Sequence, residues 1–190
     1  MWKYVLAGVL AIGMTSLGVR FATQALFTDT QSVAGNTFTT GTVDISSSPT
    51  SALITFSTMA PGDKVTNPIT VTNAGSLDLR YAVTSTTTEN TLAAQLDLTI
   101  KSGVTTCTNA AFDTDGTVRY GPGDLGSTTG VNVIGDPAQG SQAGDRTLAA
   151  SANEVLCFQA SLPLSTGNSF QGLTTTATFA FVSEQTKNNP

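Results

Sequence analysis

The segment from Met59 to Val83 constrains the fold of this chain most, because it combines a strict alternation with two turn signals. Apolar and polar side chains alternate on both sides of Asn73-Ala-Gly-Ser, which is the period of a half-buried antiparallel sheet. Proline followed by glycine fits the centre of a type II turn, because glycine accepts the positive φ that this turn needs. We therefore predict a hairpin whose turn motifs contain Pro61, Gly62, Asp63 and Gly75.

Pro68 lies inside the first of these two strands. Proline has no backbone N–H and cannot donate a hydrogen bond to a neighbouring strand. We therefore predict that this strand lies at the edge of a sheet or carries a bulge at Pro68.

The rest of the chain continues in short strands separated by turns. Candidate strands are Leu53–Phe56, Leu96–Lys101, Val131–Ile134, Glu154–Leu162 and Leu173–Val182. Glu89–Gln95 is the expected helix, about two turns long, and the glycine-rich stretch Thr105–Ala152 is expected to be mostly surface loop. About eight strands and one short helix predict an all-β fold, a jelly-roll-like sandwich of two antiparallel sheets with long glycine-rich loops.

The first 25 residues have the character of a secretory leader. Lys3 precedes an apolar run of the length of a signal-peptide core, and the small residues Thr23 and Ala25 occupy the minus-three and minus-one positions of a cleavage site. We expect cleavage between Ala25 and Leu26, so that the chain meets the membrane only before cleavage. Residues 26–190 then form a single secreted domain. The alternative is an uncleaved membrane anchor.

Charge and cysteine content narrow the function classes. The chain has a formal net charge of −5, and removal of Lys3 and Arg20 with the leader makes the remainder more acidic, at about −7. Without a basic patch to hold phosphates, we expect no nucleic-acid partner. Cys107 and Cys157 are the only cysteines, and an exported pair is expected to form a disulfide. The alternative, a redox pair, lacks Cys-x-x-Cys spacing.

The chain contains no histidine. Ser-His-Asp triads, Cys-His dyads and His-Glu-x-x-His zinc helices are therefore impossible. A catalytic zinc normally takes nitrogen or sulfur ligands, and neither is freely available. No local pattern selects a carboxylate pair for glycoside hydrolysis. We therefore expect a protein that is not an enzyme and uses no cofactor.

Asp113 and Asp115 are the one candidate for calcium, because carboxylate-only sites favour this ion. The sequence Asp113-Thr-Asp115-Gly116 departs from a calcium loop, with glycine at the fourth position and Asp124 at the twelfth. The alternative interpretation is a solvated Asp-Gly turn, and we expect no resident metal.

Three separated segments carry one further pattern. The first segment contains Thr23-Gln-Ala, then Phe27 and Asp29, and then Asn36-Thr-Phe-Thr-Thr-Gly-Thr-Val-Asp-Ile. The second contains Pro61-Gly-Asp-Lys-Val and Asn73-Ala-Gly-Ser-Leu. The third contains Phe170-Gln-Gly and residues 174–185. In order and spacing they resemble the TasA and camelysin (CalY) family of secreted bacterial fibre proteins. The resemblance is weak over Thr105–Ala152, and the cysteine pair departs from the better-known members.

The resemblance implies a jelly-roll subunit that is exported, trimmed by a SipW-like signal peptidase, and assembled into fibres of the extracellular matrix or cell surface. It also implies that the freed amino-terminal strand is donated to the next copy of the chain. Residues 26–40 are then the candidate donor strand, with Phe27, Val33 and Phe38 as anchors. An extended segment with apolar residues at intervals suits that role, because it can pair with an open sheet edge of another molecule. A head-to-tail contact of this kind repeats as an open filament.

Three alternatives stay open. The segment 26–40 is, in the first, an ordinary first strand of its own domain. In the second, the chain is a camelysin-type metallopeptidase, as related proteins have been classed. The third is a monomeric adhesive or carbohydrate-binding sandwich that uses Thr105–Ala152 as its recognition surface.

Overall fold

The computed structural model describes residues 37–50 and 58–189. Contacts divide the chain into two units, Met1–Thr39 and Thr40–Pro190, and the second contains every described strand. The expected leader, its cleavage site at Ala25 and Leu26, the anchors Phe27 and Val33, and the candidate strand Leu53–Phe56 lie outside the described residues.

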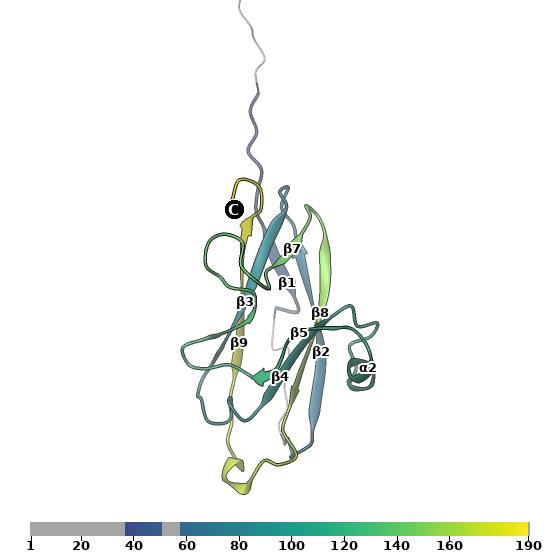
Figure 1. Cartoon of the computed structure of the whole chain (residues 1–190), viewed down its shortest axis with the longest axis vertical. Helices are drawn as coiled ribbons and strands as arrows, with labels where there is room; N and C mark the ends of the chain where they lie inside the picture. The colour runs from purple at the N-terminus through teal and green to yellow at the C-terminus, as the bar shows by residue number, and fades with distance from the viewer. Residues whose placement is uncertain (1–36, 51–57, 190) are drawn as a thin grey trace, which may run out of the picture. The chain divides into compact units, whose positions relative to one another are not determined.

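The second unit is an all-β sandwich of two antiparallel sheets, as predicted (Figure 1). Its strands are β1 (Ile45–Ser48), β2 (Lys64–Asn73), β3 (Leu79–Thr87), β4 (Asp97–Ser102), β5 (Thr117–Asp124), β6 (Val131–Ile134), β7 (Arg146–Leu148), β8 (Asn153–Ser161) and β9 (Ala177–Gln185). Two short helical elements accompany them, α2 (Asn109–Thr114) and the 3-10 turn η2 (Asn168–Phe170).

The first sheet, called sheet A here, has the strand order β1-β2-β8-β4-β5. Sheet B is centred on β3, which pairs along its whole length with β9 on one side and with β6 and β7, one after the other, on the opposite side. Figure 1 shows β3 and β9 in one layer and β2, β8 and β4 in the other. The edge strands of sheet A, among the described residues, are therefore β1 and β5. In sheet B, β9 forms one edge, and the short strands β6 and β7 together form the opposite edge.

Side chains from both sheets meet in one core. The largest fully buried apolar ones are Val71, Leu98, Ile100, Leu156 and Phe158 from sheet A, and Leu79, Tyr81, Val83 and Val133 from sheet B. β4 shows the predicted alternation, because it buries its apolar positions and leaves Asp97, Thr99 and Lys101 less covered. β8 does not alternate in burial, because all five residues from Leu156 to Ala160 are buried. Burial of these side chains is the main source of stability in a fold of this kind.

The predicted hairpin over Met59–Val83 is wrong in one respect. Both strands exist, but β2 pairs with β1 and β8, whereas β3 pairs with strands of sheet B. The turn after Asn73 therefore carries the chain from one sheet to the other. Alternation gave the correct inward faces, but it does not distinguish a hairpin from an arch between two sheets.

Asn73 is the residue that makes this arch, and it is fully buried. Its side-chain amide donates hydrogen bonds to the carbonyls of Leu77, Leu148 and Ala149 at 2.8, 3.2 and 3.0 Å. Its side-chain oxygen accepts from the N–H of Gly75 at 2.9 Å. Since Asn73 ends β2 in sheet A and Leu148 ends β7 in sheet B, one amide group ties the two sheets together.

A second polar tie crosses the sandwich. Tyr81 of β3 donates a hydrogen bond from its hydroxyl to Glu154 of β8 at 2.6 Å. Arg146 of β7 donates to the same carboxylate at 2.5 Å. Burial, and the neighbouring Glu154 carboxylate, raise the pKa of the Tyr81 hydroxyl, so it remains a donor at all physiological pH values.

The prediction that the strand of Pro68 is an edge strand or bulged is wrong, because β2 lies between β1 and β8 with an unbroken register, but Pro68 does lie where β2 lacks a strand partner on one side. β2 pairs with β8 along its length, but on the other side β1 ends at Ser48, opposite Thr70. No other described strand covers the part of β2 before Thr70. The side of β2 that contains Pro68 therefore pairs with no described strand, and its one described hydrogen-bond partner there is the side chain of Asn109 in α2, which donates to the Lys64 carbonyl at 2.9 Å.

The helix prediction is wrong in its position. Glu89–Gln95 forms a turn, with hydrogen bonds from Ala94 to Asn90 and from Leu96 to Leu92, and β4 begins before a second turn can form. The helix is instead α2, which begins where Thr108 accepts a hydrogen bond from the N–H of Ala111. Its weak apolar periodicity concealed it, because Phe112 is its only buried residue.

The stretch Thr105–Ala152 contains more regular structure than expected, since α2, β5, β6 and β7 all lie within it, but a little over half of its residues lie outside these elements. β6 has the bounds predicted for it, Val131–Ile134. β5 was concealed by Gly121 and Pro122, which lie inside the strand, where its pairing with β4 shifts register. Here glycine and proline mark an irregular edge strand instead of a loop.

Replacement of Asn73 tests the tie at the arch. We expect Asn73→Ala to lower the free energy of unfolding by about 2–3 kcal/mol, because it leaves buried carbonyls without a donor. Asn132→Ala is the matched control, since exposed Asn132 accepts one hydrogen bond from Thr84 and its loss should cost under about 0.5 kcal/mol. Equal effects of the two changes in urea denaturation would show that Asn73 has no special role.

Candidate functional site: an apolar groove between the sheets

A groove of about 1040 Å³ opens between the free part of β2 in sheet A and β9 in sheet B. Its apolar lining comes from both sheets and from the loops at one end of the sandwich. The apolar lining residues include Met59, Pro61, Val65, Ile69, Leu92, Leu96, Leu125, Leu162, Phe170, Phe179 and Phe181. The groove therefore opens onto the same core that the two sheets enclose elsewhere.

Burial changes across the groove. Its floor is covered, since Ile69, Leu96 and Leu162 are all buried. The wall formed by β9 is not, because Phe179 and Phe181 pack against the core but stay half-buried. Phe179 contacts the buried ring of Phe158 edge-on at a centroid distance of 4.9 Å, so it is held in place while one side of its ring faces the groove. The β9 wall has the burial expected of a sheet face that lacks part of its cover.

The turn before β4 forms another part of the wall. The carboxylate of Glu89 accepts hydrogen bonds from the N–H groups of Thr91, Leu92 and Ala93 at 2.6, 2.9 and 3.1 Å. These bonds fix the turn that presents Leu92 to the groove. Desolvation acts to raise the pKa of Glu89, but the bonds from the Leu92 and neighbouring N–H groups outweigh it and lower this pKa.

The turn motif predicted around Pro61 lies at the rim of the groove. Gly62 has a φ of +95°, and the N–H of Asp63 donates to the carbonyl of Ala60 at 2.9 Å, as a type II turn requires. The N–H of Gly62 also donates to the carbonyl of Leu162 at 2.7 Å. The motif therefore joins the start of β2 to the end of β8 and shapes one end of the groove.

Gly75 lies at the opposite end of β2, where it meets the start of the described chain. The N–H of Ser76 donates to the carbonyl of Thr42, and the N–H of Thr42 donates to the hydroxyl of Ser76 at 3.0 Å. A Cβ at Gly75 would collide with the Thr42 carbonyl oxygen, so only glycine permits this approach. Two of the three segments that carried the family resemblance thus meet here, in a contact that we call the Thr42–Ser76 clasp.

Residues 37–44, which contain the predicted anchor Phe38, are all exposed. The Phe38 side chain is 94% exposed, the highest value among the large apolar residues of the described chain. A phenylalanine so exposed contributes nothing to the core. The role of Phe38 as an anchor stays a prediction.

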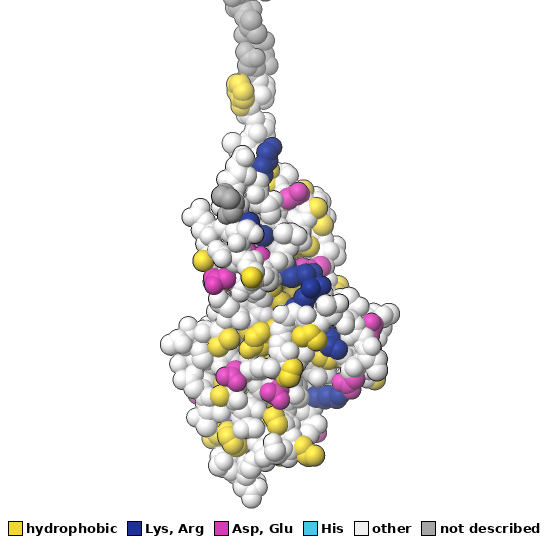
Figure 2. Space-filling model, viewed as in Figure 1, with side chains coloured by type: hydrophobic (Ala, Val, Ile, Leu, Met, Phe, Trp, Pro, Cys, Tyr) yellow, Lys and Arg dark blue, Asp and Glu magenta, His cyan; other side chains and the backbone are white. Residues whose placement is uncertain are grey.

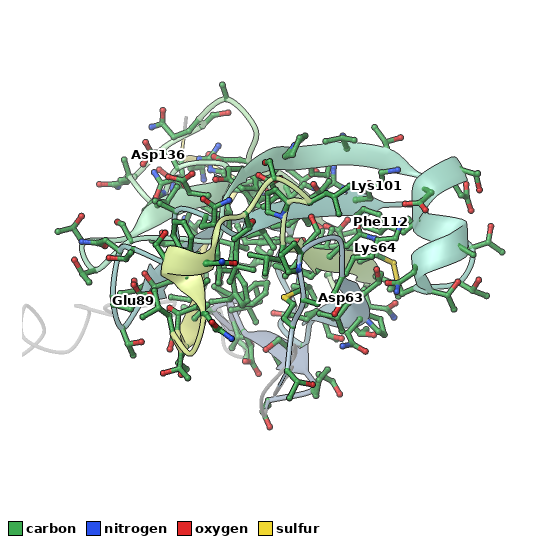
Figure 3. All side chains as sticks on the ribbon, turned by 90° about the horizontal axis from the view of Figure 1, so that it is seen from below. Asp63, Lys64, Glu89, Lys101, Phe112 and Asp136 are labelled. Carbon is green, nitrogen blue, oxygen red and sulfur yellow. A yellow bond between two sulfur atoms is a disulfide. The ribbon has the colours of Figure 1, made fainter. Side chains whose placement is uncertain are left out.

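The other predicted site residues lie away from the groove, beside α2. Cys107 and Cys157 form the expected disulfide, which ties the start of α2 to β8. Asp113 pairs with Lys64, and Asp115 accepts from the N–H and hydroxyl of Thr105, both at 2.7 Å. Figure 3 shows Lys64, Lys101 and Phe112 at this helix, with Glu89 on the other side of the domain. The calcium hypothesis for Asp113 and Asp115 stays a prediction.

A comparison with protein families gives one match. The description of the matching family is camelysin metallo-endopeptidase, and the match covers residues 3–120, more than half of the chain. The chain belongs to the camelysin family. This confirms the resemblance to the TasA and camelysin group and supports the expected secreted or cell-surface location. A search of curated proteins finds no match.

The name of the camelysin family implies a metal, and the residues of this chain do not fit a zinc site. Histidine is absent, and both cysteines are in the disulfide. Within residues 37–50 and 58–189, no three His, Cys, Asp or Glu side chains form a group that could hold a metal ion. The same residues include no helix that is long and apolar enough to cross a membrane.

Most of the surface on the face that Figure 2 presents is uncharged. Figure 2 shows Lys and Arg concentrated beside sheet A on the face that it presents, with carboxylates scattered among polar side chains. Sequence reasoning found the turn motif and the exposed Phe38 but missed the groove. The sequence feature related to the groove is the alternation of Ala177, Phe179 and Phe181. This alternation does not distinguish a strand face that is fully covered from one that is partly open.

Acid should loosen the wall of the groove through Glu89. Because folding lowers the pKa of Glu89 below its ordinary value of 4.5, its stabilising contribution is complete above that value and is lost as the pH falls through the lower folded pKa. We expect urea denaturation to show a larger loss of stability between pH 7 and pH 3 in the natural chain than in Glu89→Gln. An identical pH dependence in both would contradict this role.

Proposed function

We propose that this chain is a secreted structural subunit that polymerises into extracellular matrix or cell-surface fibres. In this proposal residues 26–40 of one copy insert into the groove of the next copy. The observation that carries it is the apolar groove alongside β9, whose phenylalanines remain half-buried. Membership of the camelysin family supports the secreted setting.

The energetic reason for insertion is burial. Complete burial of a side chain such as valine or phenylalanine is worth about 1.5–3 kcal/mol. A strand in the groove would bury its own apolar residues and complete the cover of Phe179 and Phe181. Both gains are available to a second copy, so the contact stabilises a polymer without requiring any ligand.

The length and attachment of the amino-terminal segment also suit the proposal. The Thr42–Ser76 clasp fixes its base beside Asn73, whereas the groove is lined by the first half of β2 and by Pro61 at the far end of that strand. Fifteen extended residues span about 50 Å. Because donor and acceptor surfaces differ, the contact is heterologous and continues as an open filament.

The spacing of the proposed anchors adds a constraint. Phe27 and Val33 are six residues apart and lie on one face of a regular strand. Phe38 follows Val33 by five residues and faces the other way unless the strand contains a bulge. Gly35, which lies between them, tolerates such a bulge.

Processing would act as the switch for assembly. While residues 1–25 remain attached, they tether the donor strand at the membrane, and the signal peptidase is a partner only during export. Cleavage between Ala25 and Leu26 would free the strand. The partner of the mature protein is then another copy of itself.

Two neighbouring substitutions test donor-strand insertion. We expect Val33→Asp to abolish fibres, because it places a charge in an apolar groove. Ser32→Asp is the matched control, since alternate side chains point to opposite faces and the carboxylate introduced at position 32 would stay in solvent. Negative-stain microscopy and sedimentation of the processed chain report the outcome. Fibres from Val33→Asp as abundant as those from Ser32→Asp would contradict insertion of this face.

The metallopeptidase alternative is tested directly. Because the chain lacks histidine and its cysteines are paired, we expect purified processed protein to show no chelator-sensitive cleavage of casein. Cleavage that purifies with the protein and disappears on addition of EDTA would contradict the proposal that it is not an enzyme.

A further inference from the structure

The edges of the sandwich differ in how well they are protected against pairing with another strand. Natural sheets protect their edges with short strands, prolines, bulges and charges. β1 has only four residues and is followed by Pro49, and β6 and β7 have four and three. β5 contains Gly121 and Pro122 and is irregularly paired. β9 has nine residues, no proline, and no charge before Glu184.

The direction of the backbone groups on β9 follows from its pairing with β3. The N–H of Thr88 donates to the carbonyl of Thr176, and the N–H of Thr186 donates to the carbonyl of Asp78. The register between these two bonds is unbroken. In antiparallel pairs, hydrogen-bonded positions alternate along the strand. The even-numbered residues of β9 therefore point their backbone groups at β3, and the odd-numbered ones point away from it.

The odd-numbered residues of β9 are Ala177, Phe179, Phe181, Ser183 and Gln185. β3 is the only described strand that pairs with β9, so this edge is open among the described residues. The first three of these residues also direct their side chains into the groove. One row of residues therefore presents both open backbone groups and half-buried apolar side chains.

The free part of β2, on the other side of the groove, offers fewer backbone hydrogen-bond donors to an added strand than β9 does. The N–H of Ala74 donates to the carbonyl of Asp44 in the β1 direction, and the N–H of Asn73 donates to that of Ala152 in the β8 direction. Even-numbered residues of β2 therefore face the free edge, and Pro68 is one of them. Every odd-numbered residue of β9 can donate an N–H at the open edge, whereas Pro68 has no N–H to donate at the free edge of β2.

We propose that β9 is the acceptor strand of the polymer, so that residues 26–40 of a second copy extend sheet B by pairing with the edge of β9. This inference rests on the proposed fibre function and deepens it by naming the strand that binds. Phe179 and Phe181 then form the surface on which the donor side chains pack. Pro68 keeps the donor from pairing with β2 instead.

Amide hydrogen exchange on fibres, read residue by residue by NMR after dissolution, tests the assignment. The monomeric reference is the full processed chain with Phe27, Val33 and Phe38 all replaced by Asp. In that reference we expect slow exchange at Thr178, Ala180 and Val182 and fast exchange at the odd-numbered residues from Ala177 to Ser183. In fibres of the natural chain, the odd-numbered amides should slow by at least about tenfold.

The possible outcomes separate the two proposals. Fibres in which the odd-numbered β9 amides stay fast while those of Lys64 and Thr66 slow would overturn the assignment of β9 but keep donor-strand assembly. Fibres with neither change would overturn both, as would a processed chain that forms no fibres at all.

A pair of substitutions at one position supplies a second measurement. Ser183→Pro removes one N–H from the open edge of β9 and leaves the pairing with β3 intact, because this N–H points away from β3. Ser183→Ala keeps the N–H. We expect Ser183→Ala to form fibres and Ser183→Pro to form at most about a tenth as many at an unchanged melting temperature. Equal fibre yield from two folded variants would contradict the assignment.

Discussion

One buried side chain holds the two sheets of this sandwich in register. Asn73 ends β2 in sheet A, and its amide donates to the carbonyl of Leu148, where β7 of sheet B ends. The same residue bonds to both sides of the arch that leads into β3. The arch in turn supplies Gly75 and Ser76 to the Thr42–Ser76 clasp. The position of Thr42 therefore depends on the same group that joins the sheets.

The opposite half of the sandwich is less complete. There the groove lies between the free part of β2 and β9, and β9 presents phenylalanines that the described residues leave half-buried. The half tied by Asn73 would let a subunit fold alone, and the half that contains the groove would let it bind a second copy of itself. The tie at Asn73 and the bonds of Tyr81 and Arg146 to Glu154 stabilise the monomer without using the groove.

Sequence alone determined much of the fold, for identifiable reasons. Alternation in β2, β3, β4 and β8 gave the correct inward faces, and the missing N–H of Pro68 indicated a position without a strand partner on one side, although β2 is not an edge strand. It failed where one pattern has two structural outcomes. A glycine turn joins either a hairpin or an arch, and the arch after Asn73 is set by carbonyls 75 residues away. β5 and α2 were missed because glycine and proline mask an irregular strand and a helix of six residues has little periodicity. The groove is a property of packing between distant strands, so no local pattern revealed it.

The camelysin family name points to proteolysis, whereas we propose assembly into fibres. Cryo-electron microscopy of filaments grown from the processed chain tests this account most directly. We predict density for a strand of the neighbouring copy in the groove, continuous with that neighbour's Thr42–Ser76 clasp and covering Phe179 and Phe181. Filaments in which a strand of the same copy fills the groove, or in which the groove is empty, would contradict it.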